Sequence, residues 1–161
     1  MSPSISVIVN CYNGEAFLRE AIDSIINQTY EDWELVFFDN QSTDDSVQIL
    51  QSYSDPRVKI FHSKSFLKLG EARKLAFEET KGDWVAFLDT DDYWYPQKLE
   101  TQIKSLQTGD YILCYAGIHE IDPTGKILKK TVPRYGSGHH LDLQLRQFEI
   151  NMVTPLISKK A

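Results

Sequence analysis

The fold is decided by residues 5–14, which read ISVIVNCYNG. The first part, Ile5–Val9, is a short apolar run of the kind that forms a buried strand, and Asn10–Gly14 is a turn signal. From Glu15 to Gln28 the apolar residues recur with the period of a helix. A buried strand, a turn and an amphipathic helix in this order predict the first unit of a βαβ repeat.

The same alternation continues along the chain. Further strands are expected at Trp33–Phe38, Val58–Phe61, Trp84–Leu88 and Tyr111–Tyr115, and helices from Ser42 or Thr43 onward, at Glu71–Thr80 and at Gln97–Leu106. After residue 115 the pattern predicts a hairpin from Ala116–Ile121 and Lys126–Val132, a short helix at Leu141–Phe148 and a strand at Met152–Ile157. We therefore expect an α/β fold with a Rossmann-like, mostly parallel sheet flanked by helices and a small hairpin near the C-terminus.

Composition narrows the class of protein. The 161 residues are 42% hydrophobic and fit one domain with a real core. A net charge of -6 disfavours a nucleic-acid binder, which needs a basic face for phosphates. Residues 1–4 resemble no signal peptide, and no apolar stretch is long enough to span a bilayer. The two cysteines, Cys11 and Cys114, lie far apart in the sequence, and we interpret them as reduced thiols. We therefore expect a cytoplasmic protein.

Polar side chains follow three of the expected strands. Asn10 and Tyr12 come after the first strand, Asp39 and Asn40 after the second, and an acidic run at 89–92 after the fourth. Ligands of open parallel sheets bind beyond the carboxyl ends of the strands. If the first strand lies between the second and the fourth, all three clusters converge on one crevice.

The acidic run has the chemistry of a metal site. Asp89 and Asp91 are two residues apart, so in an extended segment their side chains point the same way. Carboxylates this close repel one another unless a cation lies between them, and hard oxygen ligands favour Mg²⁺ or Mn²⁺. The alternative is that these residues interact with the dipole of the helix that begins near Pro96, a role that suits Asp92.

A phosphate group would need charged side chains here, because the sequence has neither a Walker motif nor GxGxxG. Arg73, near the start of the third helix, could reach a diphosphate. The alternative for Arg73 is a surface ion pair with a nearby carboxylate.

Five segments together resemble the family 2 glycosyltransferases, which have the GT-A fold. They are residues 5–14, 24–30 (SIINQTY), 38–44 (FDNQSTD), 70–73 (GEAR) and 86–94 (AFLDTDDYW), in the order of the family. The resemblance runs in register from about Ile5 to Gln102 and more weakly beyond. It implies one GT-A domain over residues 1–161, with a nucleotide-binding half at 1–115 and the start of an acceptor half at 116–161.

The resemblance also implies roles for the polar clusters. The activity that the resemblance implies is transfer of a sugar from a nucleotide-diphosphate donor to an acceptor hydroxyl. UDP-sugars would be the favoured donors, and the transfer would proceed with inversion and with Mn²⁺ or Mg²⁺. Asn10 and Tyr12 would line the base and ribose pocket, with Tyr12 packing on the nucleotide. Asp39 and Asn40 would face the base, and Arg73 would approach the diphosphate. Asp89-Thr90-Asp91 would be the DxD motif, in which Asp91 binds the metal and Asp89 holds ribose or a metal-bound water.

The sequence departs from the family in several places. The second acid after the second strand is replaced by Asn40, and Lys74 stands where the family usually has Asn. The family's catalytic base, an Asp, typically lies beyond a strand like Met152–Ile157, so the base is expected after the end of this chain, which reads as truncated. The remaining downstream acids, none in a position that recommends it, are Glu120, Asp122, Asp142 and Glu149.

Two other functions remain open from the sequence. A nucleotidyltransferase would need a glycine-rich, basic loop after the first strand, where Asn10–Glu15 has one glycine and no cation. A nucleotide-binding module without turnover would fit the missing base. Expected partners are a sugar or lipid-linked acceptor, no nucleic acid, and peripheral contact with the inner face of the membrane through a basic stretch at 126–134. Smaller features have structural alternatives: Tyr93-Trp94-Tyr95 as a helix staple, and His139-His140 as a polar loop.

Overall fold

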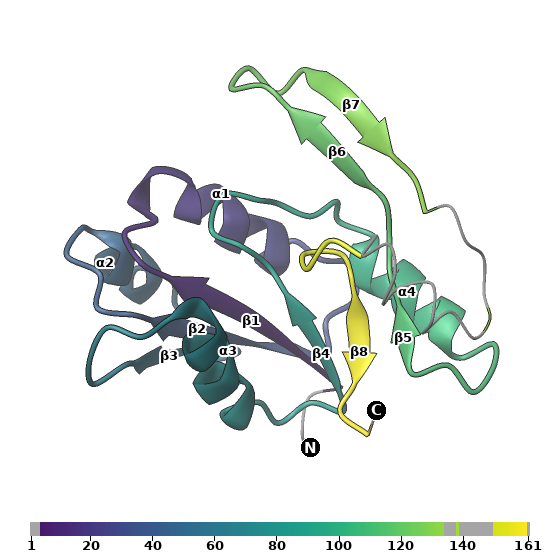
Figure 1. The fold of residues 1–161 in the computed structure, drawn as a ribbon, viewed down its shortest axis with the longest axis horizontal. Coiled ribbons are helices and arrows are strands. Elements are labelled where there is room, and N and C mark those ends of the chain that lie inside the picture. Colours follow the sequence, from purple (N-terminus) through teal and green to yellow (C-terminus); the bar gives the residue numbers. More distant parts are fainter. Residues whose placement is uncertain (1–3, 134–137, 139–149, 161) are drawn as a thin grey trace.

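The computed structural model describes residues 4–133, 138 and 150–160, and they form one α/β unit with a projecting hairpin (Figure 1). Its strands are β1 (Ile5–Cys11), β2 (Trp33–Asp39), β3 (Val58–His62), β4 (Trp84–Phe87), β5 (Leu113–Cys114), β6 (Ile118–Ile121), β7 (Ile127–Thr131) and β8 (Leu156–Ser158). Its helices are α1 (Glu15–Ile26), α2 (Ser46–Gln51), α3 (Leu69–Glu78) and α4 (Lys98–Leu106). None of the helices described is long and apolar enough to cross a membrane.

The main sheet has the strand order β3-β2-β1-β4-β8-β5. β1 pairs in parallel with β2 and β4, and β2 pairs in parallel with β3. The first strand lies between the second and the fourth, which is the condition under which the three polar clusters were expected to converge. β8 lies antiparallel between β4 and β5, so the C-terminal segment fills the place beside β4.

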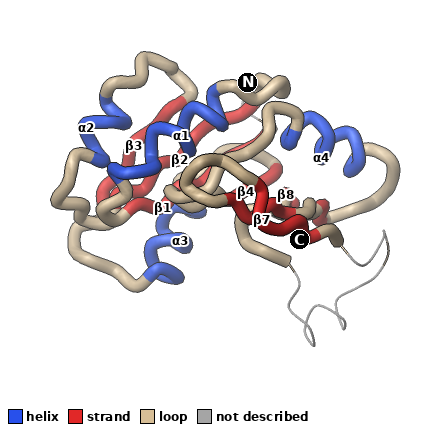
Figure 2. Tube along the Cα trace, turned by 90° about the horizontal axis from the view of Figure 1, so that it is seen from above, coloured by secondary structure: helices blue, strands red, loops and turns tan. Residues whose placement is uncertain are grey.

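Helices cover both faces of the sheet (Figure 2). Alternate residues of the central strands pack against the helices of one face or the other. Val7, Val9 and Phe37 pack with α1, α2 and α4 in the larger core cluster. Ile8 and Val36 belong to a second cluster with Ala72 and Ala76 of α3 on the opposite face. Successive strand side chains point to opposite faces, so strands buried on both sides are continuously apolar. This explains why residues 5–9 carry so strong a strand signal.

Most bounds differ from those expected by one or two residues, and the differences at α2, β5 and β8 are the most marked. α2 begins at Ser46 rather than at Ser42 or Thr43, because those two residues bond to the loop after β1. β5 has two residues rather than Tyr111–Tyr115. β8 begins at Leu156 rather than Met152, because Thr154 donates its backbone N–H to Asn151 O and closes a turn. The helix predicted at 141–148 lies outside the described residues.

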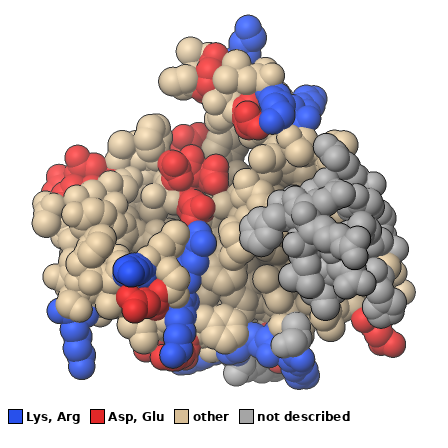
Figure 3. Space-filling model, in the orientation of Figure 1, with Lys and Arg blue, Asp and Glu red and all other residues tan. Residues whose placement is uncertain are grey.

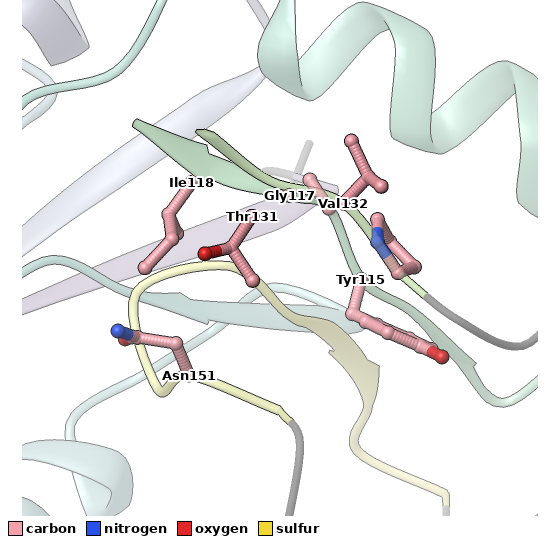
Figure 4. A pocket seen from close by; sticks show the side chains of 8 residues that line it. Tyr115, Gly117, Ile118, Thr131, Val132 and Asn151 are labelled. Carbon is pink, nitrogen blue, oxygen red and sulfur yellow. The ribbon is translucent and has the colours of Figure 1, made fainter. Parts of the chain in front are cut away.

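The predicted hairpin is present as β6 and β7. Its turn is held by the Asp122 carboxylate, which accepts hydrogen bonds from Thr124 and from the backbone N–H of Lys126. These bonds, that of the Thr124 side chain first, lower the pKa of Asp122. A small cavity of about 190 Å³ lies at the base of the hairpin, between Ile118 and Thr131 of the strands and Asn151 of the segment before β8 (Figure 4).

Candidate functional site

The polar clusters after β1, β2 and β4 meet at the carboxyl edge of the sheet. Asn40 donates its backbone N–H to Cys11 O at 2.8 Å, which joins the first two clusters. A Cβ placed on Gly14 would lie 3.0 Å from the Cβ of Thr90, so the loop after β1 also touches the acidic segment. The convergence that the sequence predicted is therefore present in the structure.

The acidic segment contacts Arg73 of α3, the cationic residue expected near this edge. Arg73 Nη2 lies 2.9 Å from Asp89 Oδ1, and the Asp89 side chain is 45% exposed. This is the ion pair that the sequence left as an alternative for Arg73, and it lies at the site itself. Figure 3 shows acidic side chains gathered at the centre of this face, next to the place where the hairpin projects.

Two more carboxylates follow Asp89. Asp91 and Asp92 are both exposed, and both line a second, larger cavity that is separate from the one at the base of the hairpin. Although the residue is exposed, partial desolvation of its carboxyl group, and then the charges of Asp91 and Asp89, raise the pKa of Asp92. Among the residues described, no three His, Cys, Asp or Glu side chains are placed to hold a metal ion on their own. A metal at this edge would therefore need oxygen ligands from a bound molecule.

Asp39 ends β2 and is buried, with 6% of its side chain exposed. Its Oδ1 accepts the backbone N–H of Ser42 at 3.0 Å, and its Oδ2 lies 3.3 Å from His62 Nδ1. The β2–β3 register places Asp39 directly opposite His62. The carboxylate thus has protein partners on both oxygens.

The side-chain amide of Asn40 makes two hydrogen bonds to the backbone of a single residue, Leu67. Its Nδ2 donates to Leu67 O at 2.9 Å, and its Oδ1 accepts from Leu67 N at 3.0 Å. The side chain therefore holds the loop between β3 and α3.

Asn10 and Tyr12 have contrasting environments at the end of β1. Both polar atoms of the Asn10 side chain are inaccessible and without a hydrogen-bond partner in the described structure. Such groups are rare and cost free energy, so they often mark sites that bind a ligand or water. The Tyr12 ring is 53% exposed and contacts the ring of Phe66, at 4.8 Å between centroids.

A cavity of about 740 Å³ opens beside the acidic segment. Its walls include Asp91, Asp92, the first turns of α4, β6, and Asn151, Val153 and Thr154 before β8. Tyr95 and His119 join two of its walls through a 2.9 Å hydrogen bond. Trp94 is buried and donates to Val153 O, so of the three neighbouring aromatic residues it is the one that packs into the core.

Gln28 fixes the segment that leads from the acidic residues into α4. Its Nε2 donates to Ser24 O and Tyr95 O, and its Oε1 accepts from Leu99 N. The side chain is buried, so these bonds replace those that water would supply. The end of α1 thereby positions the acidic edge.

The sequence missed the roles of His62, Phe66 and Gln28. Strand register could have found His62, since a strand starting at Val58 reaches its end opposite Asp39. Phe66 lies in a loop, and no periodic signal marks it. His139 and His140 lie outside the described residues.

The chain belongs to the family described as Glycosyl transferase family 2, which it matches over residues 6–157. Its mixed α/β sheet with a small hairpin agrees with this family's GT-A fold, as the solved structures below show.

One curated relative is the UDP-Glc:alpha-D-GlcNAc-diphosphoundecaprenol beta-1,3-glucosyltransferase WfgD of Escherichia coli, 34% identical over 80% of this chain and 50% of that protein. S. aureus TarS in complex with UDP-GlcNAc is 27% identical, with a TM-score of 0.66 over 70% of this chain and 33% of that one. The mannosyltransferase PcManGT from Pyrobaculum calidifontis, in complex with GDP-Man and Mn²⁺, is 17% identical, with a TM-score of 0.72 over 99% of this chain and 46% of that one.

The chain spans less than two thirds of the length of the first curated relatives that it matches, 64% in one case and 25% in the next.

Proposed function

We propose that this chain carries the donor site of a metal-dependent, inverting glycosyltransferase that moves a sugar from a nucleotide-diphosphate donor to an acceptor hydroxyl. The observation that carries the proposal is the Arg73–Asp89 pair with Asp91 beside it, at the sheet edge where the loop after β1 also ends. Membership of glycosyltransferase family 2 supports it.

The metal is proposed to be Mn²⁺ or Mg²⁺, held by Asp91 and Asp89. The donor set fits such an ion: exposed or half-exposed carboxylate oxygens, with further positions left for phosphate oxygens and water. When bound, the ion would stabilise the negative charge that develops on the departing diphosphate. Arg73 would add a second positive charge there, exchanging one Asp89 oxygen for a phosphate oxygen.

The donor is proposed to be a UDP-sugar. The name of WfgD gives UDP-Glc as its donor. TarS, which is 27% identical to this chain, has been solved in complex with UDP-GlcNAc. Asn10, Tyr12, Asp39 and Asn40 are proposed to form the side of the site that receives base and ribose. Of these, Tyr12 presents an open ring, whereas Asp39 and Asn40 act through the loops that they hold.

The acceptor is proposed to enter the cavity of about 740 Å³ beside Asp91. A sugar on a lipid diphosphate is the acceptor class suggested by the name of WfgD. Lys126, Lys129 and Lys130 on the hairpin would then lie toward the inner face of the membrane, with Lys129 also paired to Glu120 at 2.9 Å. Residues 1–115 would form the nucleotide-binding half and residues 116–161 the start of the acceptor half.

A second candidate is a nucleotide-binding module without turnover. One observation favours it: two of the acids downstream of the metal motif are engaged elsewhere, Glu120 with Lys129 and Asp122 in the hairpin turn. Asp142 and Glu149 lie outside the described residues. The catalytic base is therefore unassigned.

A thermal-shift panel of UDP, GDP, dTDP and CMP, each with Mn²⁺ and with chelator, tests the donor site. The proposal predicts that one nucleoside diphosphate raises the melting temperature, and that it does so only when Mn²⁺ is present. UDP is the nucleotide expected to have this effect. Release of UDP from UDP-sugars in the presence of a lipid-linked acceptor then separates the enzyme from the binding module. Stabilisation by no nucleotide, or equal stabilisation in chelator, would refute the metal-dependent site.

A further inference from the structure

Lys98, the first residue of α4, is a partly buried lysine that the proposed donor site does not use. It lines the cavity of about 740 Å³ together with Trp94 and Gln102. Its Nζ donates to Gln102 Oε1 at 2.8 Å and lies 3.8 Å from the centroid of the Trp94 ring. An ammonium has three N–H donors, so these two neighbours leave one of them for another partner.

The protein around Lys98 supplies no negative charge to balance it. Within residues 4–133 and 150–160, no carboxylate forms an ion pair with its Nζ. Glu100, the acid in the first turn of α4, pairs with Lys104 and accepts a hydrogen bond from Thr29 instead. The Cys114 thiol interacts with Lys98, but burial raises the pKa of this thiol and keeps it uncharged at neutral pH.

The position of Lys98 carries two energetic costs. Burial without a counter-charge disfavours the ammonium and lowers the pKa of Lys98 to about 7. A cation in the first turn of a helix also opposes the helix dipole. A Met side chain would fill a similar space at neither cost. Groups kept at such a cost are typical of functional sites, where a ligand brings the missing charge.

Gln102 holds the ammonium of Lys98 in place. The Gln102 side chain is buried, and its Nε2 donates to Thr154 O at 2.8 Å and to Cys114 O at 3.2 Å. These two carbonyls fix the orientation of the amide, so its Oε1 faces Lys98. A long and flexible side chain is therefore held in one position before any ligand binds.

The rest of the cavity suits a sugar ring. Its volume lies within the range of roughly 300–1,000 Å³ that is typical of small-molecule sites. Tyr95 lines it and is 54% exposed, and its hydroxyl lies 2.9 Å from His119 Nδ1. The Tyr95 ring offers an apolar face, and Asn151 in the same wall offers hydrogen bonds. A ring with C–H groups on its faces and hydroxyls on its rim matches this lining.

We propose that Lys98 binds a negatively charged group of the acceptor, a phosphate or a carboxylate attached to a sugar ring that Tyr95 contacts. The inference rests on the proposed function, because it takes the acceptor to occupy this cavity. Asp91 and Asp92 line the same cavity and repel an anion, so Lys98 decides where in the cavity the anion lies. Lys98 thereby selects acidic acceptors over neutral ones.

Calorimetric titration with three related sugars tests this selection, with UDP and Mn²⁺ present so that the donor edge is filled. Glucose 1-phosphate carries a phosphate, methyl glucuronide carries a carboxylate, and methyl glucoside carries neither. The wild type should bind at least one of the acidic sugars about tenfold or more tightly than methyl glucoside, and the tighter of the two identifies the group. Lys98→Met should remove this preference.

A second measurement follows the charge of Lys98 itself. At about pH 8 roughly nine-tenths of the Lys98 side chains are neutral, because their pKa is about 7. A bound anion favours the charged form, so the wild type should take up about one proton with each acidic sugar. Binding enthalpies in two buffers with different ionisation enthalpies measure this uptake. The other titratable side chains of the cavity wall, which remain in Lys98→Met, are Asp91, Asp92, Tyr93, Tyr95, His119 and Glu120.

The matched control is Lys104→Met, which removes a 70% exposed lysine from the same helix. It should keep both the preference for acidic sugars and the proton uptake. Equal binding of the three sugars by the wild type, or an undiminished preference in Lys98→Met, would overturn the inference. Absence of Mn²⁺-dependent UDP binding would overturn the proposed donor site instead, and the sugar titrations would still decide the role of Lys98.

Discussion

Lys98, the first residue of α4, makes the stability of this protein depend on pH in a calculable way. Its Nζ lies 3.8 Å from the centroid of the Trp94 ring and donates to Gln102 Oε1 at 2.8 Å. Among the described residues it has no ion pair with a carboxylate. Burial lowers the pKa of Lys98 from 10.5 to about 7.

The sign follows from which state binds more protons. Between about pH 7 and pH 10.5 the unfolded chain keeps the Lys98 proton and the folded chain releases it. The free energy of unfolding therefore rises with pH in this window, and the cost of the buried ammonium is present in full below it. From about pH 7 to pH 9 this one group should stabilise the folded state by about 2 kcal/mol.

Urea denaturation of the wild type and Lys98→Met at about pH 7 and pH 9 measures this effect. Met fills a similar volume and does not titrate, so the difference in unfolding free energy, wild type minus variant, should rise by about 2 kcal/mol. Lys74→Met, which removes an exposed lysine from α3, is the control for the loss of a surface charge. If the Lys98→Met curve runs parallel to the wild type across this range, the reasoning is refuted.

Two substitutions test the contacts that hold the site in place. Gly82→Ala would put a Cβ 2.6 Å from the backbone nitrogen of Ser6, so urea denaturation should show a loss of about 3 kcal/mol, and an unchanged midpoint would contradict this close approach. Gln28→Leu would leave the Leu99 N–H buried without a partner, at a cost of about 2 kcal/mol by the same assay. It should also weaken metal-dependent UDP binding, and full affinity in a destabilised variant would show that Gln28 does not position the acidic edge.

The central part of the fold could be predicted from local patterns. Residues 5–9 and 33–38 are mostly apolar because these strands are covered on both faces, and each run stops where polar residues begin. The convergence of the polar ends depended on β1 lying between β2 and β4, the usual order of such sheets, and the structure has this order. The place of β8 could not be predicted, because its partners Trp84–Ala86 and Leu113–Cys114 lie far away in sequence and its three residues carry no register signal.

The sequence indicated which side chains gather at the candidate site, but not which of them contact one another. Arg73 and Asp89 were identified as separate candidates, and the structure joins them at 2.9 Å. Asn40 was expected to face the base, whereas its amide bonds Leu67 on both sides. That arrangement depends on where the loop after β3 ends, which no periodicity encodes.

Calorimetric titration of UDP in the presence of Mn²⁺, with wild type and Asp91→Asn, tests the central claim most directly. Asp83→Asn is the matched control, since Asp83 is an exposed carboxylate before the opposite end of β4. We predict that the wild type and Asp83→Asn bind UDP with Mn²⁺ and lose it with chelator, and that Asp91→Asn shows no Mn²⁺-dependent binding. Undiminished, Mn²⁺-dependent binding by Asp91→Asn would contradict the assignment of the metal to Asp91.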